Sequence, residues 1–227
     1  MFAYYKTNLL NELKSIKILL VSLIFIITAY TLSYYSNRLN LDLGGDFTVL
    51  SLLYGIYAFL TFLFSSILFS GIFSREIENQ SIRFITPYLS KKKIYAAKLL
   101  TMLTIFAIIL TISIAITFIV GSVGSFPLID TLMFTMFLIY IQAIVIIISL
   151  LSPNDRLASI VGLLFSLLMP ILFIVSNFVD NKFVAAINWV LPYRYISMEN
   201  SWEGLILVVL TILLIFLGLV IFERKEI

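Results

Sequence analysis

The chain has 227 residues, of which 62% are hydrophobic and only 12% are charged, and its formal net charge is +3. A soluble domain is about half apolar and about a quarter charged, so this composition excludes a water-soluble globule and indicates a membrane protein. The chain contains no histidine and no cysteine, which excludes disulfides, thiolate sites and the commonest general base and metal ligand.

The N-terminal stretch Phe2–Lys17 is amphipathic and is predicted to form a helix at the membrane interface. Apolar side chains share one face of this helix and polar ones the other; the apolar set is Phe2, Tyr5, Leu9, Leu13 and Ile16, and the polar set is Asn8, Asn11 and Ser15. The stretch fits either a simple anchor, whose lysines reach lipid phosphates, or a wall against which a partner subunit packs.

Six stretches are long and apolar enough to cross the bilayer, which takes roughly 20 apolar residues for a core of about 30 Å. They are Ile18–Tyr35, Phe47–Phe73, Leu99–Val120, Leu132–Leu151, Leu157–Ser176 and Leu205–Phe222, and none contains Asp, Glu, Lys or Arg. We therefore predict an all-α integral membrane fold with six transmembrane helices in one domain, 1–227.

The basic residues predict the orientation of these spans. With an even number of spans both termini lie on one side, and 12 of the 15 Lys and Arg residues then fall on that side. Because cytoplasmic loops carry the excess of Lys and Arg, we expect both termini in the cytoplasm. The positive charge is thus explained by topology, which argues against a nucleic-acid partner.

The longest segment on the cytoplasmic side, 74–98, has charges of both signs, as expected of a short helix that stands clear of the membrane. Pro87 is predicted to end this helix, because the residue before a proline is pushed out of the α region. The run Lys91–Lys93 follows, where anionic lipid attracts it.

The segment 177–203 lies on the other side and is too apolar for a free loop, yet too short and broken to span. We expect an interfacial or re-entrant helical hairpin with Trp189, Tyr193, Tyr195 and Trp202 at headgroup level. The domain then divides into 1–17 (interface helix), 18–73 (spans 1 and 2), 74–98 (cytoplasmic segment), 99–176 (spans 3 to 5), 177–203 (hairpin) and 204–227 (span 6 and tail).

The sequence lacks the groups that active chemistry needs. It has no Gly-rich phosphate loop, so it cannot hydrolyse ATP alone, and no acidic pair or histidine at membrane depth for proteolysis or ion coupling. Asp130, at the edge of the fourth span, fits a wetted helix N-terminus or an ion site. Gln142, in the middle of that span, fits helix–helix hydrogen bonding or a polar residue of a substrate pathway. Energy for transport must therefore come from another polypeptide.

The chain resembles the permease subunits of ABC-2 type exporters over nearly its whole length. The resemblance is carried by the topology and by the run from Ser74-Arg75-Glu76 to Pro87, followed by Ser90-Lys91 and by Lys98. The chain departs from the family pattern at Gln80-Ser81, where a Gly-Thr-like pair is usual.

The resemblance implies that the segment 74–98 is a coupling helix that docks on an ATP-binding subunit. Its contact residues would be Arg75, Glu76, Ile77, Glu78, Ile82, Arg83 and Phe84. It also implies two permease chains, identical or different, above two ATPase subunits that hold ATP and Mg²⁺, while this chain itself binds no cofactor. Trp189, Pro192 and Tyr193 would belong to an extracellular gate.

The expected function is export through a bacterial or archaeal cytoplasmic membrane. Walls rich in Ile, Leu and Phe suit an amphipathic or hydrophobic substrate such as a peptide, lipid or drug, and the resemblance favours antimicrobial-peptide export or immunity. Two other hypotheses stay open: a membrane protein that sequesters such a ligand without pumping, and a membrane-embedded enzyme, which the missing His, Cys and buried acids disfavour.

Overall fold

The computed structural model describes residues 1–38, 49–121, 128–178, 187–195 and 201–225. In these ranges the chain is helical, with six helices long and apolar enough to cross a membrane. They are α2 (Ile16–Arg38), α3 (Val49–Phe69), α6 (Lys91–Gly121), α7 (Leu128–Leu151), α8 (Asp155–Ser176) and α10 (Ser201–Arg224). The prediction of six spanning helices is confirmed at this level, and the architecture fits a multi-pass membrane protein.

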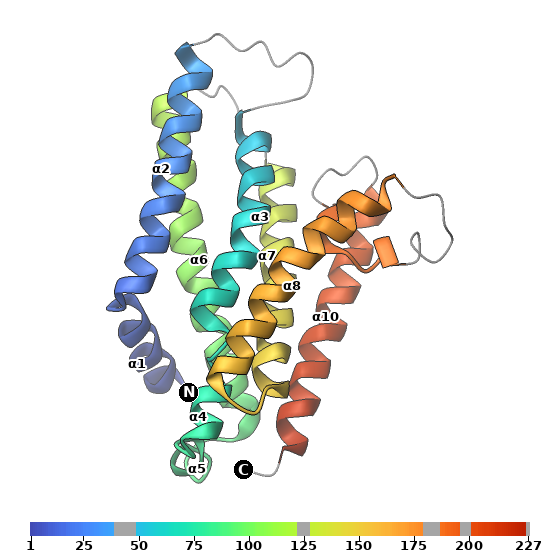
Figure 1. The fold of residues 1–227 in the computed structure, drawn as a ribbon. Helices are drawn as coiled ribbons and strands as arrows, with labels where there is room; N and C mark the ends of the chain where they lie inside the picture. Colours follow the sequence, from blue (N-terminus) through green and yellow to red (C-terminus); the bar gives the residue numbers. More distant parts are fainter. Residues whose placement is uncertain (39–48, 122–127, 179–186, 196–200, 226–227) are drawn as a thin grey trace.

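The described chain also contains the shorter helices α1 (Phe2–Leu13), α4 (Ser74–Glu78) and α5 (Ile82–Ile85) and the 3₁₀ turn η1 (Pro192–Tyr195). Figure 1 shows both termini, α1, α4 and α5 at one end of the bundle, whereas η1 lies further along it, beside α8 and α10. We call the first the basic end, because most of the Lys and Arg residues lie there.

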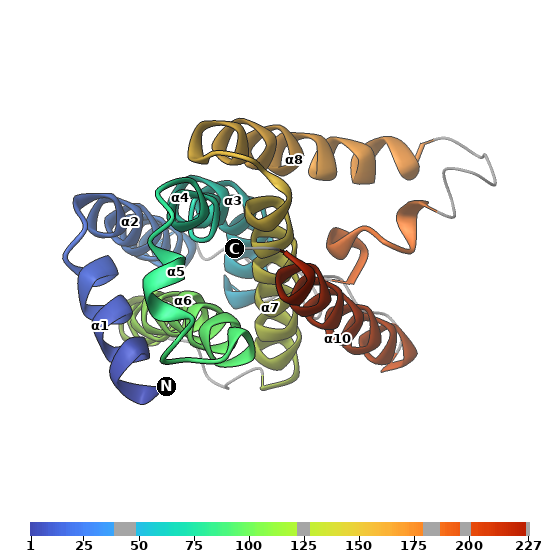
Figure 2. The same ribbon diagram turned by 90° about the horizontal axis from the view of Figure 1, so that it is seen from below.

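Helix α7 is the central element of the bundle. It packs against α3, α6, α8 and α10, and two thirds of its most apolar window is buried, against about a fifth for α8 and α10. Figure 2, along the bundle, shows α2, α3 and α6 on one side of α7, α10 on the other, and α8 across the outside. The exposed faces of α8 and α10 are rows of Leu, Ile and Phe, a surface that suits lipid and not water.

Aromatic side chains fill the interior between α2, α3, α6 and α7. Phe25 lies edge-on to Tyr57 with ring centroids 4.6 Å apart, and Tyr57 donates its hydroxyl proton to the carbonyl of Phe25 at 2.6 Å. Tyr54 stacks on Phe134 at 5.0 Å. These contacts bury large rings while satisfying the tyrosine hydroxyls, which a dry interior requires.

Several predicted boundaries differ from the structure, and two of these differences affect the basic end. The N-terminal helix ends at Leu13 instead of Lys17, and α2 begins at Ile16. The third span begins at Lys91 instead of Leu99, so the last part of the predicted connecting segment is helical and belongs to the bundle. Lys98 is consequently buried inside the protein, at 3% exposure.

Candidate functional site

The start of α4 is held by a side chain of the central helix. Ser149 of α7 is fully buried, and its hydroxyl oxygen accepts hydrogen bonds from the backbone N–H groups of Phe73 at 2.9 Å and Ser74 at 3.1 Å. The first N–H groups of a helix have no partner within the helix. Ser149 therefore supplies from outside the acceptor that the N-terminus of α4 needs.

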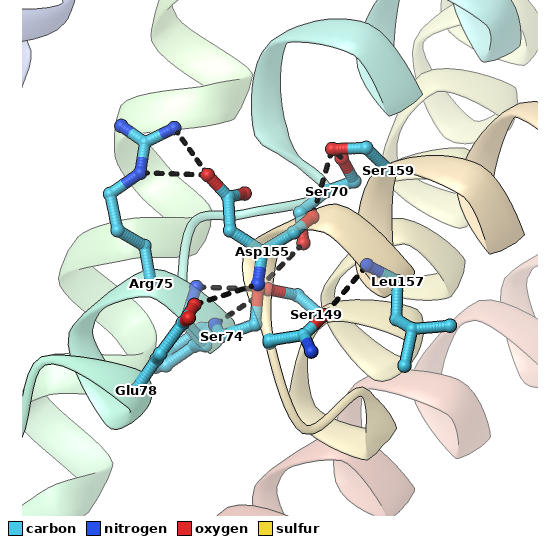
Figure 3. A network of polar contacts seen from close by, with 10 residues as sticks. Ser70, Ser74, Arg75, Glu78, Ser149, Asp155, Leu157 and Ser159 are labelled. Atoms are coloured by element: carbon cyan, nitrogen blue, oxygen red, sulfur yellow. Dashed lines mark hydrogen bonds and ion pairs between the residues drawn. The ribbon is translucent and has the colours of Figure 1, made fainter.

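Asp155, the first residue of α8, joins α4 to α8 (Figure 3). Arg75 donates from Nε and Nη2 to the same Asp155 carboxylate oxygen, at 3.1 and 3.0 Å. In return, the Glu78 carboxylate accepts the backbone N–H of Asp155 at 3.1 Å. The Arg75–Asp155 pair is partly exposed, so it orients α4 relative to α8 but adds little to the stability of the fold.

Gly71 leaves room for the Asp155 side chain at this junction. A Cβ atom at Gly71 would lie 1.8 Å from Oδ1 of Asp155, well inside van der Waals contact. A side chain at position 71 would therefore displace the Asp155 carboxylate from its present position.

Glu76 connects α4 to α6 on the opposite side of the turn. Its carboxylate lies 2.8 Å from the ammonium group of Lys98, which also donates to the carbonyl of Ile72 and lies 4.9 Å from the centre of the Phe73 ring. A buried ammonium group needs such partners, because leaving it unpaired away from water costs several kcal/mol. Helix α4 is thus tied to α6, α7 and α8.

The outer part of the segment is exposed. Gln80, with a φ of 54°, separates α4 from α5, so the single short helix expected before Pro87 is in fact two. Ile82 is completely buried, whereas Phe84 is 78% exposed and Tyr88 is 87% exposed. Two large aromatic rings therefore face away from the bundle at its basic end.

The structure divides the seven predicted contact residues into two groups. Arg75, Glu76 and Glu78 make the intramolecular contacts described above, and Ile77 and Ile82 pack on the core. Arg83 and Phe84 are exposed, and among the described residues the Arg83 guanidinium donates only to Oε1 of Gln80 in its own turn, at 3.4 Å. Tyr88 is a further exposed candidate that the sequence reasoning missed, although its position beside Pro87 was a signal.

Lys91, the first lysine after this loop, forms hydrogen bonds to another helix. Lys91 donates to the backbone carbonyls of Glu223 at 3.1 Å and Lys225 at 2.7 Å, near the last turn of α10. A lysine satisfies carbonyls at a helix C-terminus and complements the dipole there. The start of α6 is thereby joined to the end of α10.

Away from the basic end, η1 contains two of the three predicted gate residues. Tyr193 is buried, with its ring 5.6 Å from Phe137 and 6.2 Å from Phe173, and Pro192 is buried beside it. Trp189 is 44% exposed, and the Arg194 guanidinium lies 3.8 Å from its ring centre. The rest of the predicted hairpin, 179–186 and 196–200, lies outside the described residues.

Gln142 forms a contact between two spanning helices. It is fully buried in α7 and donates from Nε2 to the hydroxyl of Ser65 in α3 at 3.0 Å. Its amide oxygen is buried without a partner in the described part of the chain. The helix–helix hydrogen bond expected of this residue is present. Asp130 lies in the first turn of α7, the position expected of a wetted helix N-terminus.

No family model matches the chain, and no curated protein is significantly similar to it. Across the described ranges, no three acidic side chains gather in a way that could hold a metal ion. The geometry at the basic end is therefore the observation on which a functional proposal can rest.

Proposed function

We propose that the chain is the permease subunit of an ATP-driven exporter of the ABC-2 type, powered by a separate ATP-binding subunit that docks on α5. One observation carries the proposal. The segment α4–α5 is tied by hydrogen bonds and an ion pair to α6, α7 and α8, yet it turns Phe84 and Tyr88 outward. Exposed aromatic rings are typical anchors of protein interfaces.

This arrangement suits the transmission of force. A push on α5 reaches α4 through the short turn at Gln80, and α4 cannot move without displacing Ser149, Asp155 or Lys98. Movement of a subunit on one side could thus shift three spans together. The excess of Lys and Arg at the basic end supports a cytoplasmic location for it, where ATP is available.

The proposed assembly has two permease chains, identical or different, and two ATPase subunits that bind ATP and Mg²⁺. The proposed location is a bacterial or archaeal cytoplasmic membrane, with both termini in the cytoplasm. The proposed substrate is amphipathic or hydrophobic, with an antimicrobial peptide favoured, because the spans present Ile, Leu and Phe. Such a wall would solvate an ion or sugar poorly.

The docking surface can be tested by co-purification with the ATPase subunits of the same cell. We expect Phe84→Ala and Tyr88→Ala to reduce ATPase capture at least tenfold. Phe178→Ala is the matched control, because Phe178 is 84% exposed and lies at the far end of α8, away from the basic end. Capture that survives both loop substitutions would refute docking on α5.

Transport itself separates pumping from sequestration. Cells that carry the chain and an ATPase unable to hydrolyse ATP should lose resistance to the exported peptide. If resistance persists with the inactive ATPase, the chain sequesters its ligand without pumping, and the exporter proposal fails.

Orientation can be tested directly, because the chain has no cysteine of its own. Asn79→Cys and Asn177→Cys place single thiols at exposed positions, one on each end of the bundle. In intact cells an impermeant maleimide should label position 177 and leave position 79 unlabelled. The reverse pattern would exclude a cytoplasmic ATPase as the partner of α5.

A further inference from the structure

Helix α1 packs with polar side chains facing the bundle. Tyr5 shares a hydrogen bond with Thr104 of α6 at 2.8 Å, and Asn8 and Glu12 are half-buried, whereas Phe2 is 77% exposed. A simple interfacial anchor would keep its carboxylates in water. The inward position of Glu12 therefore calls for a chemical explanation.

Glu12 lies at a partly open cavity of about 190 Å³ that is lined by α1, the start of α2, the end of α3, α4 and α6. Figure 2 shows these elements grouped around one region of the basic end. The polar lining consists chiefly of Asn8, Glu12, Lys17, Arg75, Glu76 and Lys98. The cavity is thus large enough for a small polar group and is lined by charges of both signs.

Two of the three cations in this lining already have partners. Lys98 is bound to Glu76 and to the carbonyl of Ile72, and Arg75 is bound to Asp155. Lys17, by contrast, is exposed where α2 begins and forms no ion pair within the described ranges.

The carboxylate acceptors in the lining lack hydrogen-bond donors. Throughout the part of the chain that the structure describes, the Glu12 carboxylate forms no hydrogen bond or ion pair, and Oε2 of Glu76 is buried without a partner. One donor, Nδ2 of Asn8, is also buried; the Tyr4 hydroxyl lies beside it, but the two do not form a hydrogen bond of standard geometry. Buried polar groups are almost always paired with protein, water or a ligand, so a ligand that offers both donors and acceptors would suit this cavity.

We propose that the cavity binds the headgroup of an aminophospholipid such as phosphatidylethanolamine, with its ammonium group between Glu12 and Glu76 and its phosphate near Lys17 and Asn8. A primary ammonium group carries three N–H donors and a charge that neutralises Glu12. A choline headgroup has the same charge without those donors. The phosphate supplies the acceptors that Asn8 and Lys17 lack.

The surroundings of the cavity favour a lipid over a soluble amine. Lys17 follows Ile16, which is 76% exposed, and precedes Leu19 and Leu20, which are 60% and 55% exposed. This apolar surface begins α2, where the spanning segment starts, so acyl chains can lie against it while the headgroup enters the cavity. A water-soluble amine would gain nothing from that surface.

The experiment measures lipid retention by native mass spectrometry of the purified full chain, in mixed micelles with dioleoyl-phosphatidylethanolamine or dioleoyl-phosphatidylcholine. We expect the ethanolamine lipid to be retained about tenfold more than the choline lipid, because the choline group cannot donate the charge-assisted hydrogen bonds that the ammonium group donates. Glu12→Gln should abolish the preference. Glu223→Gln, the same substitution at the same end but outside the cavity, should keep it.

A second variant tests the phosphate side of the cavity. Asn8→Leu fills part of the cavity without changing the charge, and it should lower the retention of both lipids, because they share the phosphate that Asn8 faces. Equal retention of the two lipids by the unaltered chain, or an unchanged preference in Glu12→Gln, would overturn the proposal. Displacement of the lipid by an equimolar amount of free phosphoethanolamine would show that the ligand is soluble and would also overturn it. No ATPase takes part, so the outcome is independent of the proposed function.

Discussion

Lys98 and Glu76 form a 2.8 Å ion pair in which the lysine side chain is 3% exposed and the glutamate side chain 24% exposed. The pair joins a spanning helix, α6, to the short helix α4 at the basic end. Its burial makes it the polar contact whose removal should have the largest effect on the protein.

Replacing either partner alone should destabilise the bundle strongly. Lys98→Met leaves the Glu76 carboxylate without its counter-charge, and breaking a buried pair in this way costs about 3–5 kcal/mol. The double variant Lys98→Met/Glu76→Gln removes both charges and should recover most of that loss. Thermal unfolding in detergent measures the stability of the parent chain, the two single variants and the double variant. Single variants as stable as the parent chain would contradict the burial of the pair.

Gly71→Ala should disrupt the junction between α4 and α8. The new methyl group would lie 1.8 Å from Oδ1 of Asp155, so the carboxylate must shift and loosen its contact with Arg75, at a cost of up to about 1 kcal/mol for an exposed pair. Gly55→Ala is the matched control, because nothing lies within 4 Å of a Cβ there. That control should gain up to about 1 kcal/mol from helix propensity. Equal effects at both positions would contradict the close approach.

Ser149→Ala should loosen the start of α4. It leaves the N–H groups of Phe73 and Ser74 buried without an acceptor, which costs about 1–3 kcal/mol for each unsatisfied group. Ser152→Ala is the control, because the Ser152 hydroxyl donates only to the Ile148 carbonyl of its own helix. Hydrogen exchange at residues 73–78 should rise in the first variant alone; exchange that rises equally in both would refute the role of Ser149.

The stability of the delipidated chain should depend on pH through Glu12. Burial raises the pKa of Glu12 above its ordinary value of 4.5, with nearby Glu76 acting in the same direction and Lys98, Arg75 and Lys17 opposing it. The folded state therefore binds this proton more tightly than the unfolded chain, so ionisation destabilises the fold above the raised pKa, and the penalty is lost as the pH falls to 4.5.

Glu12→Gln should accordingly raise the unfolding temperature at neutral pH by a few degrees, and the gain should vanish as the pH approaches 4.5. Glu223→Gln is the control, because the Glu223 carboxylate lies 3.7 Å from Lys92 in an exposed pair. A gain for Glu12→Gln that stays constant over this range would contradict the raised pKa.

The sequence was sufficient to predict the fold class and the number of spans. Each span is a long apolar run without charges, and a helix that crosses lipid must satisfy its backbone internally, so local composition alone predicts it. The break between the second and third spans was also evident in the sequence, because Pro87 and the mixed charges mark it, but the exposed Tyr88 beside it was not predicted.

The tertiary structure decided which polar residues meet. Arg75, Glu76 and Glu78 looked like a free charged surface in the sequence, but their partners Asp155 and Lys98 come from other helices. The same holds for Ser149, which has no local signature, and for Glu12, which the amphipathic pattern did not place toward the bundle. Periodicity within a helix shows which residues share a face. Only the packing of helices shows what that face meets, because contacts between spans depend on their relative rotation and depth, which no single apolar run encodes.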